Sequence, residues 1–151
     1  MTQCTVDSPL GCLLLSADDQ GIRGLDFNDN DDFLVGSNHF IALLKKELEA
    51  YFLGKLKTFS VPLSPIGTAF QQQVWDVLRT IPYGETISYS REAALLKHPK
   101  ATRAVANANG KNKIAIIIPC HRVIAKDGSI GGYSGGLWRK EYLLTLEQKY
   151  R

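Results

Sequence analysis

The chain places a cysteine and a histidine side by side, directly after a run of apolar residues. Cys120 and His121 follow Pro119, and positions 114–118 hold only isoleucine and alanine. A cysteine attacks as its thiolate, which a neighbouring imidazole or positive charge favours by lowering the thiol pKa. Neighbouring residues of a regular strand face opposite sides, so an isolated pair of this kind is more often a packing feature. Because the proline interrupts that regularity, we predict that Cys120 is a nucleophile at the end of a buried strand.

The composition is that of a globular protein of one or two small units. The chain has 151 residues, of which 44% are hydrophobic, and this is enough for a packed core. No apolar stretch reaches the length needed to cross a bilayer, and the polar start lacks the regions of a secretory signal. We therefore expect a cytoplasmic protein with no membrane partner.

The three cysteines are spaced in no pattern that is typical of a zinc site. A metal site built from Cys4, Cys12 and His39 is an alternative, but thiols in the core of short strands explain the first two cysteines better. We therefore expect no metal.

Charge is distributed unevenly along the chain. Residues 1–90 hold 6 Lys and Arg against 11 Asp and Glu, whereas residues 91–151 hold 12 against 4, so the net charges are −5 and +8. Basic residues gathered in one part of a chain suggest a polyanionic partner, most often nucleic acid, although an uneven solvated surface explains the numbers equally well. The position of the basic residues must decide.

Residues 1–62 have the pattern of a small antiparallel sheet with one helix. Short segments at 2–7, 12–17 and 22–27 are separated by turn residues, which predicts three strands. Apolar residues then recur at helical spacing from position 40 until Gly54 ends the helix. A further short strand, predicted at 58–63, would rejoin the sheet.

Residues 63–151 are predicted to form a second, mostly helical domain. An apolar stripe over 70–81 predicts a helix with Trp75 in the core. Ser88 can cap a second helix, and a third follows at 100–108 after a proline. Two short helices joined tightly are typical of a helix-turn-helix, although such pairs also occur as plain packing units.

The third of these helices carries small and basic residues, so its backbone could approach a duplex closely. Arg103 would project from it and could contact bases or enter the base stack, although most helical arginines are solvated or pair with phosphate. The other candidate DNA-binding residues are Thr102, Ala104, Lys97, Lys100 and Lys111, of which the lysines suit phosphates.

Several motifs together closely resemble the O6-alkylguanine-DNA alkyltransferase family, in order and spacing, from Gly67 to Glu147. They are Gly67-Thr68-Ala69-Phe70-Gln71, Val74-Trp75, Ile81-Pro82-Tyr83-Gly84-Glu85-Thr86, Ser88-Tyr89, Arg103-Ala104-Val105, Asn112, Pro119-Cys120-His121-Arg122-Val123, Gly132-Tyr133-Ser134-Gly135-Gly136 and Leu143-Leu144 through Glu147. The set is highly specific. The first 60 residues match that family only in length and strand pattern.

The resemblance implies an α/β (α+β) fold. Its N-terminal domain would be ribonuclease-H-like, with a small β-sheet and a helix, and its C-terminal domain would be mostly helical and winged helix-turn-helix-like. The implied protein is a monomeric DNA repair enzyme without a cofactor. It would flip O6-alkylguanine, and also O4-alkylthymine, out of double-stranded DNA and transfer the alkyl group to Cys120 once per molecule. Flipping is needed because a stacked base cannot present its O6 substituent to a protein thiol.

The resemblance also implies roles for individual residues. His121 would act as the base through a water and would be oriented by Glu147, while Asn112 would fix the turn that carries Cys120. Arg103 would fill the vacated stack. The remaining pocket residues would be Tyr89 at the base N3, the Ser134 amide at O6, the Cys120 and Val123 carbonyls at the exocyclic amine, Tyr133 as a wall and Lys140 as a positive charge near the thiolate.

Two positions depart from the family pattern, and two other protein classes are alternatives. Ala106 stands where glycine is usual and could narrow the range of lesions, and Lys113 stands where proline is frequent and could contact phosphate. Lesion-binding relatives without chemistry typically carry tryptophan in place of the cysteine, so Cys120 argues for transfer. A cysteine hydrolase with Cys120 and His121 as its dyad would instead show multiple turnover on an ester.

Overall fold

The computed structural model describes residues 1–30 and 32–151, and these divide into two compact units. The first unit contains Met1–Ile66 together with Lys113–Ala115, and the second contains Gly67–Asn112 and Ile116–Arg151. Each has its own mixture of helix and strand, so the fold is α/β. In the described part of the chain, no helix is long and apolar enough to cross a membrane.

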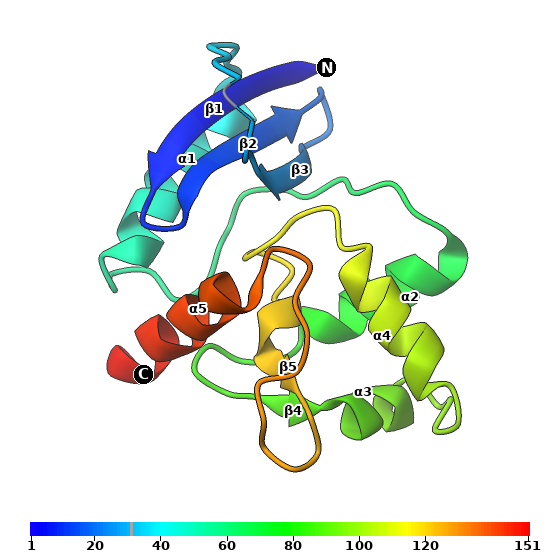
Figure 1. Ribbon diagram of the computed structural model, residues 1–151. Helices are drawn as coiled ribbons and strands as arrows, with labels where there is room; N and C mark the ends of the chain where they lie inside the picture. Colours follow the sequence, from blue (N-terminus) through cyan, green and yellow to red (C-terminus); the bar gives the residue numbers. More distant parts are fainter. Residues whose placement is uncertain (31) are drawn as a thin grey trace. The chain divides into compact units, whose positions relative to one another are not determined.

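The first unit is built on a three-stranded antiparallel sheet in the order β1-β2-β3 (Figure 1). The strands are β1 (Thr2–Ser8), β2 (Gly11–Ala17) and β3 (Ile22–Phe27), which confirms the three predicted strands. Leu13 and Leu15 of β2 are fully buried, whereas Leu14 between them is only half-buried. Strand alternation therefore gives the sheet one buried face, as its sequence pattern predicts.

The sheet register separates two of the three cysteines. Cys4 lies opposite Leu15, and Cys12 lies opposite Asp7, three positions along β1. Because directly opposed residues share a face and neighbours alternate, Cys4 and Cys12 lie on opposite faces of the sheet. They cannot converge on one ion with His39, so the alternative metal site has no basis in this geometry.

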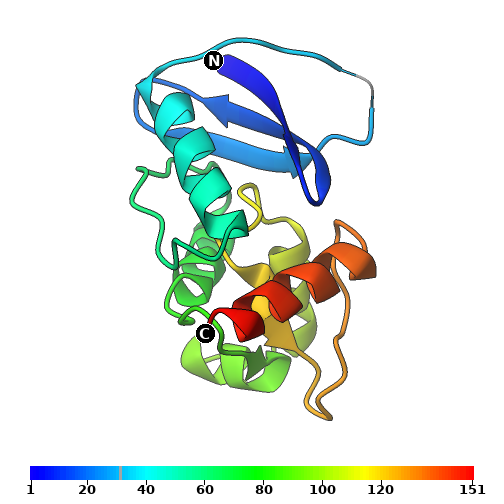
Figure 2. The same cartoon turned by 90° about the vertical axis from the view of Figure 1, so that its left-hand side faces the viewer.

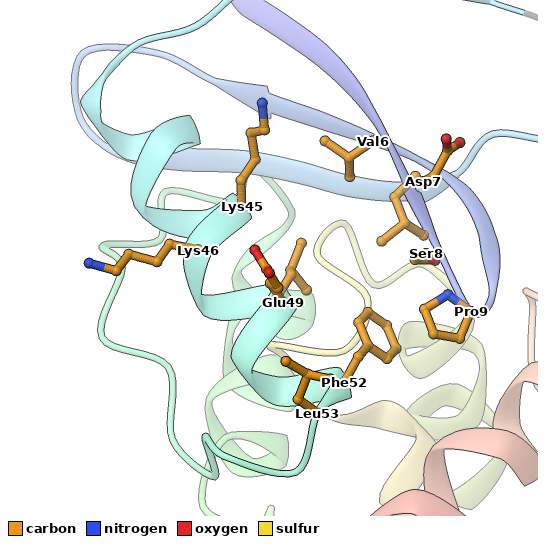
Figure 3. Close-up of a pocket in the computed structure, with 11 residues that line it drawn as sticks. Val6, Asp7, Ser8, Pro9, Lys45, Lys46, Glu49, Phe52 and Leu53 are labelled. Atoms are coloured by element: carbon orange, nitrogen blue, oxygen red, sulfur yellow. The ribbon is translucent and has the colours of Figure 1, made fainter.

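Helix α1 (His39–Phe52) begins at Asn38, whose side chain accepts a hydrogen bond from the Ile41 amide at 3.0 Å. A pocket of about 630 Å³ lies between this helix and the β1–β2 hairpin (Figure 3). Its lining is mostly apolar, and Lys45, Lys46 and Glu49 come from α1. It contains no residue of the predicted site.

The strand predicted at 58–63 is wrong. Only one bridge forms, between Ile22 and Leu63, and no strand is present there. The buried carboxylate of Glu47 instead accepts hydrogen bonds from the amides of Ser60 and Val61, each at 2.9 Å. These backbone donors are therefore unavailable for a sheet ladder.

The second unit is mostly helical, as predicted. Its elements are α2 (Ala69–Leu78), β4 (Ile87–Ser88), α3 (Tyr89–Leu95), α4 (Thr102–Gly110), the 3₁₀ helix η1 (Cys120–Arg122), β5 (Val123–Ile124) and α5 (Leu137–Lys149). Thr68 and Gln71 form a capping box on α2, and Ser88 caps α3, as its position predicts. Trp75 is buried and donates to the Ala108 carbonyl at 3.1 Å, so it ties α2 to α4.

The run at 114–118 is not the predicted strand. Ile114 makes a single bridge to Leu25, and Ile116 then has φ of 73°, a left-handed conformation that is strained for a β-branched residue. Cys120 follows on η1, whose turn is closed by a hydrogen bond from the Arg122 amide to the Pro119 carbonyl at 3.0 Å. With about three residues per 3₁₀ turn, Cys120 and His121 diverge by roughly a third of a turn rather than to opposite faces.

Candidate active site

Cys120 lies in the wall of a pocket of about 420 Å³ within the second unit. The pocket is formed by α3, by α4 and by the loop that follows β5; α3 and α4 are neighbours in Figure 1. Its lining residues are Tyr89, Ala106, Asn109, Gly110, Cys120, Gly132, Tyr133 and Ser134. Four predicted site residues from distant parts of the sequence are thus brought together, and Ala106 is beside them.

The Cys120 thiol is held mostly away from solvent, with 9% of the residue exposed. Burial raises its pKa, while a hydrogen bond from Asn112 and the charge of Lys140 act in the opposite direction without overcoming burial. Neighbouring groups therefore do lower this pKa, but burial outweighs them in the resting protein. The thiol is neutral near pH 7, and its proton must be removed before it can attack.

Asn112 joins the turn to the thiol. Its side-chain nitrogen donates to the Ile118 carbonyl at 2.7 Å and lies 3.3 Å from Cys120 Sγ. The first contact closes the segment between α4 and η1, and the second places a donor where a developing thiolate would need one. This is the location expected for a residue that fixes the turn carrying the nucleophile.

His121 and Glu147 form a buried pair, with exposures of 0% and 1%. His121 Nε2 lies 2.7 Å from Glu147 Oε2, and α5, which carries Glu147, lies beside η1 (Figure 2, red and yellow-orange). A carboxylate only accepts, so the proton must be on Nε2, and in a neutral ring the lone pair is then on Nδ1. Burial lowers the pKa of His121 even though the Glu147 carboxylate acts to raise it. The imidazole is therefore neutral near pH 7. Among the described residues Nδ1 has no hydrogen-bond partner, so it is free to take a proton.

Arg122 keeps Glu147 charged, a role that the sequence does not indicate. Its Nε and Nη2 donate to the two carboxylate oxygens at 2.8 and 3.0 Å, and its Nη1 donates to the Ile81 carbonyl at 2.7 Å. Burial alone would raise the pKa of Glu147, but the hydrogen bonds and charges of His121 and Arg122 hold it well below its usual range. All three residues of η1 are buried, and no periodic pattern in the sequence predicts this because the element is a single short turn.

Lys140 is fully buried, which is rare for a lysine. Its Nζ donates to the carbonyls of Val123 at 2.6 Å and Gly132 at 3.0 Å. Burial lowers its pKa to about 8, and the nearby Cys120 side chain opposes this shift. The Val123 carbonyl is predicted to accept a hydrogen bond from the exocyclic amine of the base. In the structure it accepts one from Lys140 Nζ, and a carbonyl oxygen has a second lone pair that could serve the base.

Tyr89, Tyr133 and Ser134 all line the pocket. The Tyr89 hydroxyl lies 3.5 Å from the Gly132 carbonyl, and burial raises its pKa, so it remains a donor at neutral pH. Gly131 has φ of 74°, and a Cβ there would lie 3.0 Å from the Tyr89 hydroxyl, so glycine is needed for this close approach. Burial also raises the pKa of Tyr133.

The predicted DNA-binding residues lie outside this pocket, on α4 and its flanking turns. Arg103 and Ala104 are exposed in the first turn of α4, and Thr102 beside them is half-buried. Lys97 and Lys100 are exposed in the turn between α3 and α4, and Lys111 is exposed at the other end of α4. Val105 and Ala108 supply the buried side of the helix, so Arg103 and the three lysines are free to meet an external partner.

Comparisons with known proteins agree over nearly the whole chain. Residues 1–65 match the ribonuclease-like domain of 6-O-methylguanine DNA methyltransferase, and residues 69–149 match its DNA binding domain. A methylated-DNA–protein-cysteine methyltransferase of Methanosarcina acetivorans is 46% identical, with coverage of 93% of this chain and 94% of that protein. The same-named protein of Mycobacterium leprae is 46% identical, with coverage of 98% and 93%.

A solved structure gives the same result. The crystal structure of Mycobacterium tuberculosis OGT in complex with DNA has a TM-score of 0.90 and 43% identity, and the match covers 98% of this chain and 93% of that one. The chain therefore belongs to the 6-O-methylguanine DNA methyltransferase family.

Proposed function

We propose that this protein is a single-turnover DNA repair enzyme that transfers the alkyl group of O6-alkylguanine, and of O4-alkylthymine, to Cys120. The observation that carries the proposal is the neutral His121, with Nδ1 unoccupied and Nε2 bound to the charged Glu147, next in the chain to a buried thiol. Such an arrangement generates a nucleophile from a neutral thiol by passing its proton to a neutral imidazole.

The proposed step is a displacement at the alkyl carbon. His121 takes the thiol proton at Nδ1, directly or through a water, as the sulfur forms a bond to that carbon. The bond between the carbon and O6 breaks, and its electron pair passes to the guanine. The proton lost by the thiol balances the proton that guanine regains, so the products are a thioether on Cys120 and an unmodified base.

Surrounding residues support this charge movement. Asn112 and Lys140 would stabilise the thiolate, and the Tyr89 hydroxyl would donate to the base, for which its raised pKa is suitable. Tyr133, the Ser134 amide and the Val123 carbonyl would bind the guanine. No chemistry in this pocket reopens a carbon–sulfur bond, so each molecule would act once.

The partner would be double-stranded DNA, bound through α4. Arg103 would enter the gap left by the flipped guanine, with Thr102 and Ala104 close to the groove and Lys97, Lys100 and Lys111 at phosphates. We further propose that the protein acts as a monomer in the cytoplasm, where its three free cysteines suit a reducing environment.

Mass spectrometry after mixing with a duplex containing O6-methylguanine tests the proposal. We expect one methyl group per chain, located on Cys120, and none on Cys4 or Cys12. Cys120→Ser should still bind the modified duplex but transfer nothing, because a serine hydroxyl ionises far less than a thiol. Tight binding by the unchanged protein without an adduct would support a lesion-binding protein instead.

A further inference from the structure

The amino group of Lys140 joins two segments that both belong to the candidate site. Its Nζ donates to the Val123 carbonyl at 2.6 Å and to the Gly132 carbonyl at 3.0 Å. Val123 directly follows η1, which begins at Cys120, whereas Gly132 lies in the loop between β5 and α5 that lines the pocket. One side chain of α5 therefore connects the segment of the nucleophile with that loop.

The charge of this lysine has no carboxylate partner. Lys140 is fully buried, and within the described residues it forms no ion pair. The titratable groups around it are Cys120 and His121 of η1 and Tyr89 of α3, whose ring centroid is 5.8 Å from Nζ. A positive charge here favours a thiolate on Cys120 and disfavours an imidazolium on His121. Only Cys120 acts in return on the pKa of Lys140, so the effect on the thiolate is the larger one.

The hydrogen bonds of Lys140 do not require its charge. An ammonium group has three N–H donors, and a neutral amine retains two of them, which is the number that the two carbonyls need. Burial lowers the pKa of Lys140 to about 8, so both forms exist at accessible pH. As the pH rises, the charge is lost while both hydrogen bonds can remain. The two contributions of this residue can therefore be separated by pH.

We propose that Lys140 is a positioning residue for the guanine: its N–H donors hold the loop that carries Tyr133 and Ser134 against Val123, and its charge acts separately on the transfer step. This inference rests on the transfer reaction proposed above. The loop backbone packs closely on the amino group, because a Cβ at Gly131 would lie 3.5 Å from Nζ. Loss of the donors should therefore loosen the guanine site, whereas loss of the charge should slow transfer from an intact site.

The first measurement uses the unchanged protein and free O6-benzylguanine from pH 7 to pH 9. The dependence of the single-turnover rate on substrate concentration gives a limiting rate and a half-saturating concentration. We expect the half-saturating concentration to stay nearly constant, because a neutral amine still donates to both carbonyls. The limiting rate should fall by about three- to tenfold, since only about a tenth of a group with a pKa of about 8 is charged at pH 9.

Two substitutions separate the donors from the charge. Lys140→Met removes both, so it should raise the half-saturating concentration by about tenfold, the value of one net hydrogen bond, and also lower the limiting rate. Lys140→Arg keeps the donors and a permanent charge, so it should preserve the half-saturating concentration and abolish the fall in rate towards pH 9. Lys149→Met, at an exposed position on the same helix, is the matched control and should change neither quantity.

An unchanged half-saturating concentration in Lys140→Met, with folding verified by urea unfolding, would mean that Lys140 acts through its charge alone and would overturn the inference. If that variant does not fold, the pH series decides: a half-saturating concentration that rises as the rate falls would show that guanine binding needs the charge. A fall in rate that persists in Lys140→Arg would mean that another group titrates, which also contradicts the inference. Absence of any benzyl transfer by the unchanged protein would refute the proposed reaction itself, and this inference with it.

Discussion

His121 Nε2 and Glu147 Oε2 are 2.7 Å apart, and neither side chain is more than 1% exposed. The same carboxylate is bound by two guanidinium nitrogens of Arg122, so its charge does not depend on a proton on the histidine. One anion is thus shared between a permanent cation and a neutral base. This arrangement orients the imidazole without making it an imidazolium, which would be unable to accept the thiol proton.

Glu147→Gln should damage both the stability and the reaction. The amide removes the negative charge and turns a donor towards His121 and Arg122, leaving a buried cation without its anion. We expect a loss of about 3–5 kcal/mol in the free energy of unfolding. Single-turnover transfer should slow by about 100-fold or more, the usual contribution of an oriented base. Urea unfolding and quenched-flow transfer measure the two effects, and Glu85→Gln, at an exposed position, is the control that should change neither.

The rate of transfer should depend only weakly on pH between about 6.5 and 7.5, which lies below the pKa of about 8 at which Lys140 begins to lose its charge. Burial lowers the pKa of His121, so the ring stays in its basic form as the pH falls through 6.5, and the rate should decline only below that. Burial raises the pKa of Cys120, so free thiolate does not accumulate as the pH rises towards 9. The measurement is the single-turnover rate with free O6-benzylguanine, which avoids pH effects on DNA binding. A rate that climbs about tenfold per pH unit through this range would indicate simple thiolate titration and contradict the role of His121.

Those parts of the fold that depend on local signals could be predicted from the sequence. The alternation around Leu13 and Leu15 predicts the sheet, and Thr68 and Ser88 mark the starts of α2 and α3 because capping is a property of a few adjacent residues. The strand predicted at 114–118 is wrong because a short apolar run is equally typical of a strand and of a buried irregular segment. Only the tertiary environment selects the left-handed Ile116.

The candidate site could be predicted for a different reason, namely its sequence motifs. The prediction is incomplete where a residue's partner is distant in the chain. Arg122 was part of a motif, but its bond to a carboxylate 25 residues away has no local signature. Glu92 has the appearance of an ordinary solvated glutamate on a short helix. Its burial depends on Asn109, 17 residues later, and no local pattern connects the two.

Glu92→Leu should stabilise the protein more at pH 8 than at pH 5. The pKa of Glu92 is raised from 4.5 to about 7, so the folded state holds this proton more tightly than the unfolded state. Stability from this group is therefore greatest below pH 4.5 and is lost as the pH rises to about 7. The difference in free energy of unfolding between variant and unchanged protein should grow by about 2–3 kcal/mol from pH 5 to pH 8. Lost packing or hydrogen bonding would change the free energy of unfolding by the same amount at pH 5 and at pH 8. A difference between variant and unchanged protein that stays constant with pH would therefore mean that Glu92 does not titrate in this range.

Arg103→Ala should separate base flipping from chemistry. If Arg103 fills the gap left by the extruded guanine, its loss should slow transfer from duplex DNA by about 10- to 100-fold, since unstacking a base costs a few kcal/mol. Transfer from free O6-benzylguanine, which leaves no stack, should be nearly unchanged. The decisive quantity is the ratio of the two rates, measured for each variant under single-turnover conditions.

Two variants provide the comparison for Arg103. Tyr89→Phe should slow both substrates, because the hydroxyl acts on the base itself. Lys100→Ala should weaken duplex binding in proportion to the lost phosphate contact and reduce its salt dependence, while leaving the free-base rate unaltered. Salt dependence alone cannot identify Arg103, since an arginine at the groove also meets phosphates. If Arg103→Ala lowers the duplex and free-base rates by one common factor, Arg103 acts by holding the second unit together and not as the residue that replaces the flipped base.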